Sequence, residues 1–314
     1  MEDKMNKKVI LSLSSCLIFL LLTGCGLLNR SNKDLEELIN VYTRDASSGT
    51  REAFEVKVGF KGDLTNQAFE VSSNGDMATK ISRDPNSIGY VSLATNFSEG
   101  GIKPLKYDGF YASPETVISN DYDLTRNFSF VTRKSGDFSS RDKEDLLKAF
   151  VDYILNSKEG RQVILAYGGI VDVDTGVYWD QLKENHEIIL KDNKDITIYT
   201  GGSTSVEKTL RAALESFIPL AGDFEINMNH TGSGDGYKRT LGSEKDGANK
   251  IDIGFFSREL KEEEDVGDTF LKGVYCKDAI VVVVNGNNAE IENLTKENLG
   301  KIFKGEIKTF KELK

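Results

Sequence analysis

Short apolar stretches alternate with amphipathic stretches along the chain from residue 39 onward. Runs rich in β-branched and aromatic residues predict strands, and apolar residues three and four positions apart predict helices. The predicted strands cover residues 69–71, 88–93, 127–133, 196–200, 224–228, 251–257 and 279–284. The predicted helices cover residues 77–82, 143–155, 161–167, 207–217 and 294–303. This alternation predicts an α/β architecture with mainly parallel sheets, in a chain long enough for two lobes.

The stretch 41–54 has the pattern of a strand, a tight corner and the start of a helix. Arg44 ends the strand, and Ser-Ser-Gly-Thr forms the corner. A helix N-terminus has backbone N–H groups without partners and a partial positive charge, so a small anion can bind there. Ser48 and Thr50 add hydroxyl donors, Gly49 lets the backbone approach closely, and Arg44 adds charge-assisted donors. An ordinary helix N-cap uses the same residue types, so this stretch alone leaves both interpretations open.

The stretch 196–206 repeats this arrangement. A strand leads into a Gly-Gly corner, hydroxyl residues that include Ser203 and Thr204, and a helical run. A third glycine-rich loop follows the strand 224–228 and contains Ser233; its glycine spacing fails the G-x-G-x-x-G dinucleotide fingerprint. Hydroxyl-rich corners from distant parts of the chain predict one anion clamped from two sides.

Residues 1–24 have the pattern of an export signal. Lysines precede an apolar run over residues 9–22, which is too short for a membrane span. The run ends in Leu-Thr-Gly-Cys, with Cys25 last, and this ending resembles the lipobox of bacterial lipoproteins. We expect cleavage before Cys25, lipid (palmitate) on its thiol, and a polar tether over residues 25–38. The alternative is a plain secretory peptide in which Cys25 is incidental.

The chain is acidic, with a formal charge of −10 at pH 7. Loss of residues 1–24 removes three positive and two negative charges, so the charge becomes −11 over the remaining 290 residues. This balance disfavours nucleic acid as a partner. An anion must therefore be bound by local donors and not by the net field. Glu2 and Asp3 are unusual at the start of an export signal, which makes Met5 an alternative start.

Cysteine and histidine are scarce. Of the three cysteines, Cys16 and Cys25 lie in the signal region, and Cys276 remains, so no internal disulfide is expected. Cys276 precedes an apolar strand, which predicts a buried structural thiol. The two histidines, His186 and His230, lack metal-ligand spacing. We expect no metal and no cofactor.

Several motifs occur together in this chain. They are Thr-Arg with Ser-Gly-Thr-Arg-Glu-Ala-Phe within 43–54, Ser-Asn-Gly at 73–75, Ile-Gly-Tyr-Val-Ser-Leu at 88–93, Gly-Ser-Thr-Ser at 202–205, Thr-Gly-Ser-Gly at 231–234, Ile-Asp-Ile-Gly with Ser-Arg within 251–258, and Leu-Thr through Phe-Lys-Gly within 294–305. As a set they resemble the phosphate-binding lipoproteins of ABC importers (PstS type), over nearly all of residues 39–314. The resemblance implies a two-lobe, periplasmic-binding-protein-like (type II) α/β fold with a hinge, and a protein that is not an enzyme.

The halves of the chain stand in the reverse of the family's order. In the family the Gly-Ser-Thr-Ser strand comes first, whereas here it follows the Arg-x-x-x-Ser-Gly-Thr strand. We therefore expect a circular permutation, with residues 181–195 as a linker between the family's old ends. The rival account is a fusion of two half-proteins that assemble by swapping with a neighbouring molecule.

The permutation predicts how the lobes are divided. The Arg44 lobe consists of residues 39–127 plus 281–314 and contains the Arg-x-x-x-Ser-Gly-Thr corner. The Thr204 lobe consists of residues 128–280 and contains the Gly-Ser-Thr-Ser corner. The hinge is expected at the crossings near residues 128–132 and 281–285.

The resemblance also implies a ligand site. By motif, phosphate is bound by Arg44, Ser48, Gly49 and Thr50 from one lobe and by Ser203, Thr204 and Ser233 from the other. Further candidate contacts are Asp235, Asn74 and Arg258. Some family members use an acidic residue at the end of the strand 251–257 to accept the proton of hydrogen phosphate and so reject sulfate. This chain has Arg258 near that position, which leaves Asp235, Asp45 and Asp76 as candidate acceptors; Asp252 is expected to be structural.

The implied partners are phosphate, the permease and ATPase of an ABC importer, and the outer face of the cytoplasmic membrane. The implied mechanism is hinge closure of a monomer around the anion. Two other functions stay open. Ser205 and Lys208 fit the Ser-x-x-Lys pattern of serine acyl-enzymes, although Ser-Asp-Asn and Lys-Thr-Gly are absent. A surface sensor or binder of phosphate or another oxyanion, without transport, is the other.

Overall fold

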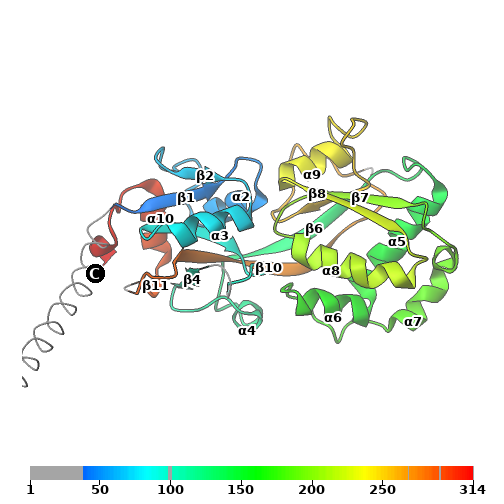
Figure 1. Ribbon diagram of the computed structural model, residues 1–314, viewed down its shortest axis with the longest axis horizontal. Helices are drawn as coiled ribbons and strands as arrows, with labels where there is room; N and C mark the ends of the chain where they lie inside the picture. The colour runs from blue at the N-terminus through cyan, green and yellow to red at the C-terminus, as the bar shows by residue number, and fades with distance from the viewer. Residues whose placement is uncertain (1–37, 98–100, 268, 290, 314) are drawn as a thin grey trace, which may run out of the picture.

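The structure is a computed structural model that describes residues 38–97, 101–267, 269–289 and 291–313. The predicted signal, Cys25 and nearly all of the tether lie outside these residues. Figure 1 shows two lobes side by side, joined by β6 (Thr125–Thr132) and β10 (Lys272–Asn285). None of the described helices combines the length and apolar character needed to cross a bilayer.

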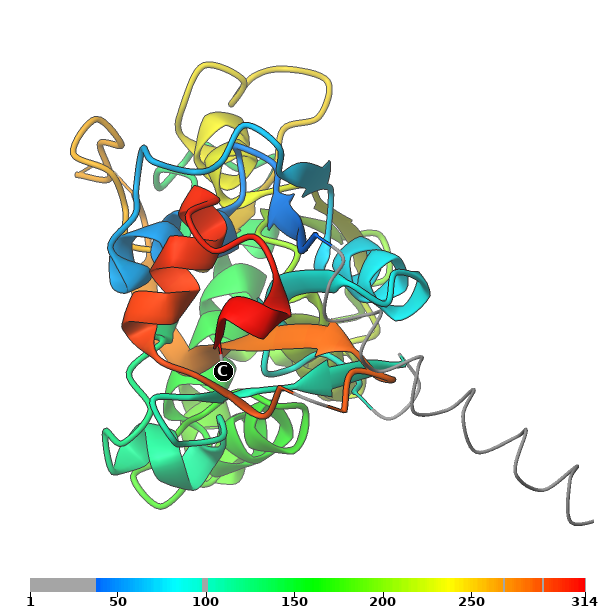
Figure 2. The same ribbon diagram turned by 90° about the vertical axis from the view of Figure 1, so that its left-hand side faces the viewer.

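The Arg44 lobe is built from both ends of the described chain. Its elements before the crossing are β1 (Asn40–Arg44), α2 (Gly49–Val58), β2 (Phe69–Val71), α3 (Asn74–Arg83), β3 (Ser87–Ser92), β4 (Ile102–Pro104), β5 (Lys106–Tyr107) and α4 (Pro114–Ile118). After β10 it adds β11 (Asn293–Leu294), α10 (Lys296–Lys304) and the 3₁₀ helix η4 (Phe310–Leu313). In Figure 2 this lobe faces the viewer, with α10 and the C-terminal segment in front.

The Thr204 lobe is continuous in sequence between the two crossing strands. Its helices are α5 (Arg141–Asn156), α6 (Lys158–Ala166), α7 (Trp179–Leu182), η1 (Lys183–Asn185), η2 (Glu187–Leu190), α8 (Glu207–Phe217), η3 (Ile218–Leu220) and α9 (Ser233–Thr240). Its strands are β7 (Thr197–Gly202), β8 (Glu225–His230) and β9 (Ile253–Phe256).

One sheet runs through both lobes in the order β2-β1-β3-β10-β6-β9-β7-β8, and β4 also pairs with β10. The outer strands of each lobe pair in parallel, as in the β1–β2 and β7–β8 pairs, whereas β4 pairs antiparallel with β10. The expectation of mainly parallel sheets is wrong for the centre of the sheet. There β10 runs antiparallel to β3 and β6, and β6 runs antiparallel to β9. The two crossing strands pass between the lobes in opposite directions, which makes their pairing antiparallel.

The sheet of the Arg44 lobe is covered on both faces. On one face Phe54 of α2 stacks on Tyr90 of β3 at 4.1 Å between ring centroids, and Phe303 of α10 packs against Phe54 at 4.8 Å. On the other face Met77 and Ile81 of α3 pack with β10. Helices on both sides of a twisted sheet form an α/β core.

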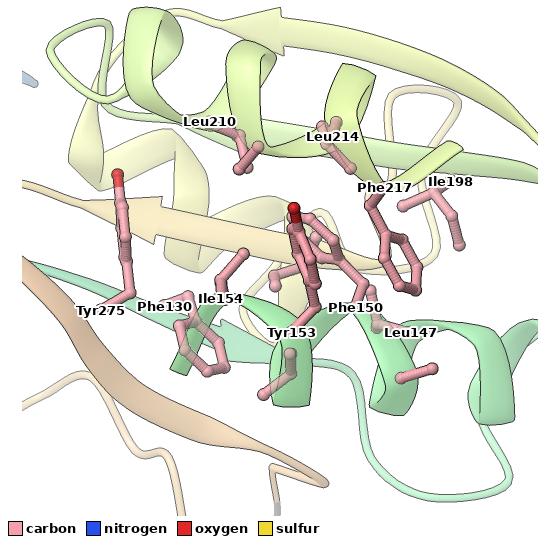
Figure 3. Close-up of a cluster of buried hydrophobic side chains, with 14 of the residues drawn as sticks. Phe130, Leu147, Phe150, Tyr153, Ile154, Ile198, Leu210, Leu214, Phe217 and Tyr275 are labelled. Carbon is pink, nitrogen blue, oxygen red and sulfur yellow. The ribbon is translucent and has the colours of Figure 1, made fainter. Parts of the chain in front are cut away.

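The Thr204 lobe has a separate core. Figure 3 shows Leu210, Leu214 and Phe217 of α8 facing the aromatic and aliphatic side chains of α5. The rings of Tyr153 and Phe217 lie 5.1 Å apart. Cys276 of β10 is also buried in this core, which confirms it as a buried thiol, and burial raises its pKa.

Local sequence determines where several helices begin. Ser48, Ser73, Ser140 and Thr295 each cap a helix by accepting a backbone N–H of its first turn. The expected helix 207–217 is observed with those bounds. The third glycine-rich corner differs from expectation, because α9 begins at Ser233 and the residues up to 236 are helical and not a loop. Packing of α9 against β9 and β7 overrides the weak helix propensity of glycine.

Residues 181–195, expected to be a polar linker, are folded. They include the end of α7 and the 3₁₀ helices η1 and η2. Ile188 is buried in the core of the Thr204 lobe, and the buried Asn193 amide donates to the backbone oxygens of Ile188 and Ala221. Ile188, with the partly buried Leu182 and Ile189, and the satisfied Asn193 amide hold this stretch against the lobe despite its polar composition.

The two lobes touch through the first turns of α2 and α9. The amide of Gly234 donates to the backbone oxygen of Ser47 at 3.2 Å. A Cβ at Gly49 would lie 2.3 Å from Oγ of Ser233 and 3.0 Å from Cγ of Arg258. These distances are well inside van der Waals contact, so the lobes approach this closely because residue 49 has no side chain.

We expect Gly49→Ala to keep the lobes further apart while leaving each lobe folded, since alanine is the better helix former. Small-angle scattering should give a larger radius of gyration for the variant than for the unchanged protein. Gly300→Ala in α10 is the matched control, because its added Cβ would meet only ordinary contacts at 3.6 Å. Indistinguishable scattering from Gly49→Ala and the control would contradict the close-approach argument.

Candidate functional site

Arg44 lies at the interface between the lobes. It is the last residue of β1, between β2 and β3, and it is 1% exposed. Its Nη2 donates to the backbone oxygen of Ser72 at 2.8 Å and to Oγ1 of Thr204 at 3.2 Å. Ser72 follows β2 in the same lobe, whereas Thr204 belongs to the other lobe. The two corners singled out in the sequence therefore face each other.

Part of the Arg44 guanidinium lacks an acceptor. Nε and Nη1 are buried without a hydrogen-bond partner among the described residues. Burial lowers the pKa of Arg44, and the Asp45 carboxylate, 3.5 Å from Nη2, opposes this shift. An arginine side chain nevertheless stays charged in proteins. Because a buried charge requires strong partners, these two nitrogens fit the place where an anion would be held.

The helix α2 begins beside Arg44. Its N-cap is Ser48, whose side chain accepts the N–H of Arg51 at 3.3 Å, so the N-cap interpretation holds for this residue. Gly49 and Thr50 follow in the first turn, where backbone N–H groups have no intrahelical acceptor. One cap satisfies only one of these groups, so the end of the helix keeps donors and partial positive charge for an anion.

A chain of serines supports the facing corner. Ser203 Oγ accepts the N–H of Ser205 at 3.2 Å and donates to Oγ of Ser257 at 2.7 Å. Ser233 Oγ accepts the N–H of Ser257 at 3.1 Å. Ser203 and Ser233 thus meet at Ser257, at the end of β9, and all are buried. Ser257 was not among the predicted site residues, although it lies in one of the recognised motifs.

His230 supports this corner through a contact with the backbone of Ser203. Its Nδ1 lies 3.0 Å from the backbone oxygen of Ser203, and its Nε2 lies 3.0 Å from Oγ1 of Thr200. Burial lowers the pKa of His230 to about 4, so the ring is neutral at pH 7. A carbonyl oxygen can only accept, which assigns the ring hydrogen to Nδ1 and makes Nε2 the acceptor of the Thr200 hydroxyl.

Arg126 was missed by the sequence reasoning. It lies on β6, is buried, and donates through Nε and Nη2 to Oδ2 of Asp278 at 2.9 and 2.7 Å. Its Nη2 also donates to Oγ of Ser205 at 3.0 Å. The sequence offered two signals: Arg126 comes just before the apolar part of one strand, and Asp278 comes just before the apolar run of another. The pairing itself joins residues far apart in sequence.

The candidate proton acceptors already have partners. Asp235 accepts the Thr231 hydroxyl at 2.7 Å, Asp76 accepts the N–H of Ser72 at 3.1 Å, and Asp45 accepts the N–H of Ser47 at 3.0 Å. Asp252, expected to be structural, forms an ion pair with Lys143 at 3.0 Å.

The two remaining candidate contacts differ in their surroundings. Arg258 forms ion pairs with Glu264 at 2.6 Å and with Glu52 of the other lobe at 3.1 Å, so its charge is balanced by protein groups. Asn74, the first residue of α3, donates to Oγ of Ser205 across the lobes at 3.0 Å. Asn74 therefore lies in the interface, whereas the guanidinium of Arg258 is engaged by two carboxylates.

Ser205 and Lys208 do not form a nucleophile and base pair. Lys208 Nζ donates to the backbone oxygen of Ala94 at 3.0 Å. The Ser205 hydroxyl instead contacts Thr50, Asn74 and Arg126. The geometry that an acyl-enzyme needs is a hydrogen bond between the two catalytic groups, and the described contacts do not provide it.

A pocket of about 360 Å³ is lined by residues of both lobes and lies next to the contacts of Thr204 and Ser205. Its lining includes Asn74, Ser92, Thr204, Ser205, Glu207 and Arg211. Burial raises the pKa of Glu207, and Arg211 and Arg44 oppose this shift. Over the residues that the structure describes, no cluster of three His, Cys, Asp or Glu side chains is placed to hold a metal.

Comparisons with known proteins find relatives over nearly the whole chain. Phosphate-binding protein PstS 2 of Streptococcus agalactiae is 29% identical over 313 residues, which is 97% of this chain and 97% of that protein. Phosphate-binding protein PstS of Borreliella burgdorferi matches over 139 residues at 29% identity, which is 41% of this chain and 47% of that protein. These matches confirm the resemblance to PstS-type proteins, and both relatives are named as binding proteins, in agreement with the expectation of a non-enzyme.

A solved structure and a family also match. The crystal structure of a phosphate ABC transporter, phosphate-binding protein from Streptococcus pneumoniae superposes with a TM-score of 0.61 at 27% identity, covering 88% of this chain and 100% of that chain. Residues 29–159 and 191–313 match the sequence model of the PBP superfamily domain. The chain therefore belongs to the PBP superfamily, and its two lobes joined by a hinge form the periplasmic-binding-protein fold.

Proposed function

We propose that this protein captures inorganic phosphate between its two lobes and delivers it to the permease and ATPase of an ABC importer. The observation that carries the proposal is the Arg44 guanidinium, which is buried at the interface with Nε and Nη1 lacking acceptors among the described residues. An oxyanion supplies acceptors of the right charge and geometry for such a fork. The names of the relatives support phosphate as the anion.

The proposed ligand set draws on both lobes. Arg44, the first-turn amides of Gly49 and Thr50, and the hydroxyls of Ser48 and Thr50 bind from one side. Thr204 and Ser233 bind from the other, while Ser203, whose hydroxyl donates to Ser257 and whose N–H donates to the backbone oxygen of Phe255, holds the corner in place. Asn74, Arg258 and Asp235 already have protein partners, so we assign them to shaping the site and not to holding the anion.

The proposed mechanism is closure around the hinge strands β6 and β10. A ligand favours the closed form only by the contacts that it makes in that form and not in the open one. An anion that bridges Arg44 of one lobe and Thr204 of the other meets this requirement. The closed form would then dock on the permease.

We predict that Arg44→Ala abolishes measurable phosphate binding in titration calorimetry. The variant loses several charge-assisted donors at once, which corresponds to at least about a hundred-fold in affinity. Arg133→Ala is the control, because Arg133 is also buried but pairs with Asp137 and Asp246, outside the interface. Binding by Arg44→Ala within about threefold of the unchanged protein would reject the role of Arg44. Titrations with sulfate and molybdate establish which oxyanion is preferred.

A second candidate function, a phosphate sensor or binder without transport, shares the same site. Measuring phosphate uptake distinguishes the two functions, because uptake requires an importer component and does not require a sensor. Normal uptake by cells that lack this chain would favour the sensor.

We further propose that the protein is anchored by lipid on Cys25 to the outer face of the cytoplasmic membrane. The Leu-Thr-Gly-Cys ending of the apolar run supports this. Cys25→Ser should abolish palmitate labelling and shift the protein from the membrane fraction to the soluble fraction. Unchanged labelling would favour the plain secretory peptide.

We also propose that the chain, like PstS 2 of Streptococcus agalactiae, is circularly permuted relative to PstS proteins in which the Gly-Ser-Thr-Ser half comes first, and that it works as a monomer. Leu38 bridges Thr309, and the N–H of Ile39 donates to the backbone oxygen of Lys308 at 2.8 Å, so the two segments that the family's order would join lie side by side. PstS 2 matches over nearly its full length, as expected if its halves stand in the same order as here. The Borreliella protein matches over less than half of each chain, as expected if its halves stand in the reverse order.

Restoring the family's order tests the permutation. A chain in which residue 313 is joined to residue 38 through a short glycine linker, with new ends between residues 191 and 195, should fold and bind phosphate like the original. Light scattering of both chains should give monomers. A strictly dimeric binder would support the swapped half-proteins instead.

A further inference from the structure

The Ser205 hydroxyl is the point where both lobes and the hinge meet. It lies at the corner between β7 and α8 of the Thr204 lobe. Its Oγ is 2.9 Å from Oγ1 of Thr50 and 3.0 Å from Nδ2 of Asn74, both in the Arg44 lobe. Nη2 of Arg126, on the hinge strand β6, is also 3.0 Å away.

The chemistry of these partners determines the direction of each hydrogen bond. Oδ1 of Asn74 accepts the N–H of Ser92 at 3.2 Å, so the amide end facing Ser205 is the donating Nδ2. The guanidinium of Arg126 can only donate. Two donors fill both lone pairs of Ser205 Oγ, so its single hydrogen is left for Thr50.

Thr50 is thereby made an acceptor toward Ser205. No further hydrogen-bond partner of its hydroxyl is found among the described residues, so its own hydrogen is free to be donated elsewhere. Thr50 lies in the first turn of α2, next to the amides proposed to face the anion.

Arg126 is held in place by the hinge. Asp278 and Arg126 are cross-strand partners in the antiparallel pairing of β10 with β6. Oδ2 of Asp278 accepts from Nε and Nη2 of Arg126, and Oδ1 accepts the Ser92 hydroxyl at 2.9 Å. The side chains of this ion pair are 2% and 0% exposed. Such a buried pair orients the guanidinium rigidly toward Ser205.

We propose that Arg126 is a positioning residue which, together with Asn74, directs the Ser205 hydroxyl to Thr50, so that Thr50 donates its hydrogen to the bound anion. This inference rests on the proposed function, because it requires an anion at the interface. Thr50 and Asn74 approach Ser205 from the opposite lobe, so the relay is complete only when the lobes are together. Ser205 itself has no donor left for the ligand.

A double-mutant cycle with phosphate tests the relay. Arg126→Met combined with Asp278→Asn removes the ion pair without leaving a charge unpaired, and it frees one lone pair of Ser205 to accept from Thr50. In the original background this change should weaken phosphate binding about ten-fold, as expected for one misdirected charge-assisted hydrogen bond. In a Thr50→Val background, which has no hydrogen to misdirect, the same change should alter affinity by less than about threefold.

Three further variants complete the experiment. Thr50→Ser keeps a hydroxyl and should restore the ten-fold effect. Asn74→Ala frees the other lone pair of Ser205 without touching the ion pair, so it should show the same dependence on Thr50 even if the ion-pair variant fails to fold. Arg133→Met, at a buried arginine outside the interface, should lower stability and leave affinity unchanged.

The outcomes separate the relay from the function on which it rests. Equal losses in the original background and in the Thr50→Val background would overturn the relay alone, because they would mean that Arg126 acts independently of that hydroxyl. Failure of the unchanged protein to bind phosphate would overturn the proposed function and the relay with it.

Discussion

A buried positive charge with incomplete solvation is the constraint on which the interface depends. Removing a guanidinium from water costs several kcal/mol in order of magnitude unless acceptors replace the water. Arg126 is compensated by Asp278, whereas Arg44 has one backbone carbonyl, one hydroxyl and the Asp45 carboxylate at 3.5 Å, all on Nη2. The two arginines also disfavour each other's charge. Arg44 therefore keeps buried donors without acceptors among the described residues, in a protein whose formal charge is −10.

The contacts between the lobes are suited to reversible closure. They are hydrogen bonds and ion pairs, such as Thr50 with Ser205, Lys208 with Ala94, and Glu52 with Arg258, and close approach is allowed by glycine at position 49. Water can replace each such contact when the lobes separate, so each contributes only about 1 kcal/mol net. The large apolar clusters are built mainly within one lobe each, although Ile170 of the Thr204 lobe joins the cluster of the Arg44 lobe. A bridging anion adds contacts to both lobes at once and so can control the balance between open and closed forms.

The continuous sheet joins the two lobes and connects the hinge strands to the hydroxyl network between them. β10 pairs with β3 in one lobe and with β6 toward the other, so strands of a single sheet join the two lobes. The Arg126–Asp278 pair sits where these strands cross and also reaches the hydroxyl network between the lobes. The strands that would bend in the proposed closure and the side chains that would meet an anion are thus linked by two hydrogen bonds, from Arg126 to Ser205 and from Ser205 to Thr50.

The sequence by itself determined the local elements and the two facing corners. Periodicity placed α8 at its observed bounds, and the residues around Arg44 and Thr204 were identified because a strand, a glycine corner and a capped helix are local patterns. Tertiary structure alone decided the start of α9 at Ser233, the packing of residues 181–195 through Ile188, and the role of Arg126. Arg126 and Asp278 are 152 positions apart, and their pairing depends on strand register. Register is determined by packing across the whole sheet, which short-range sequence patterns do not encode.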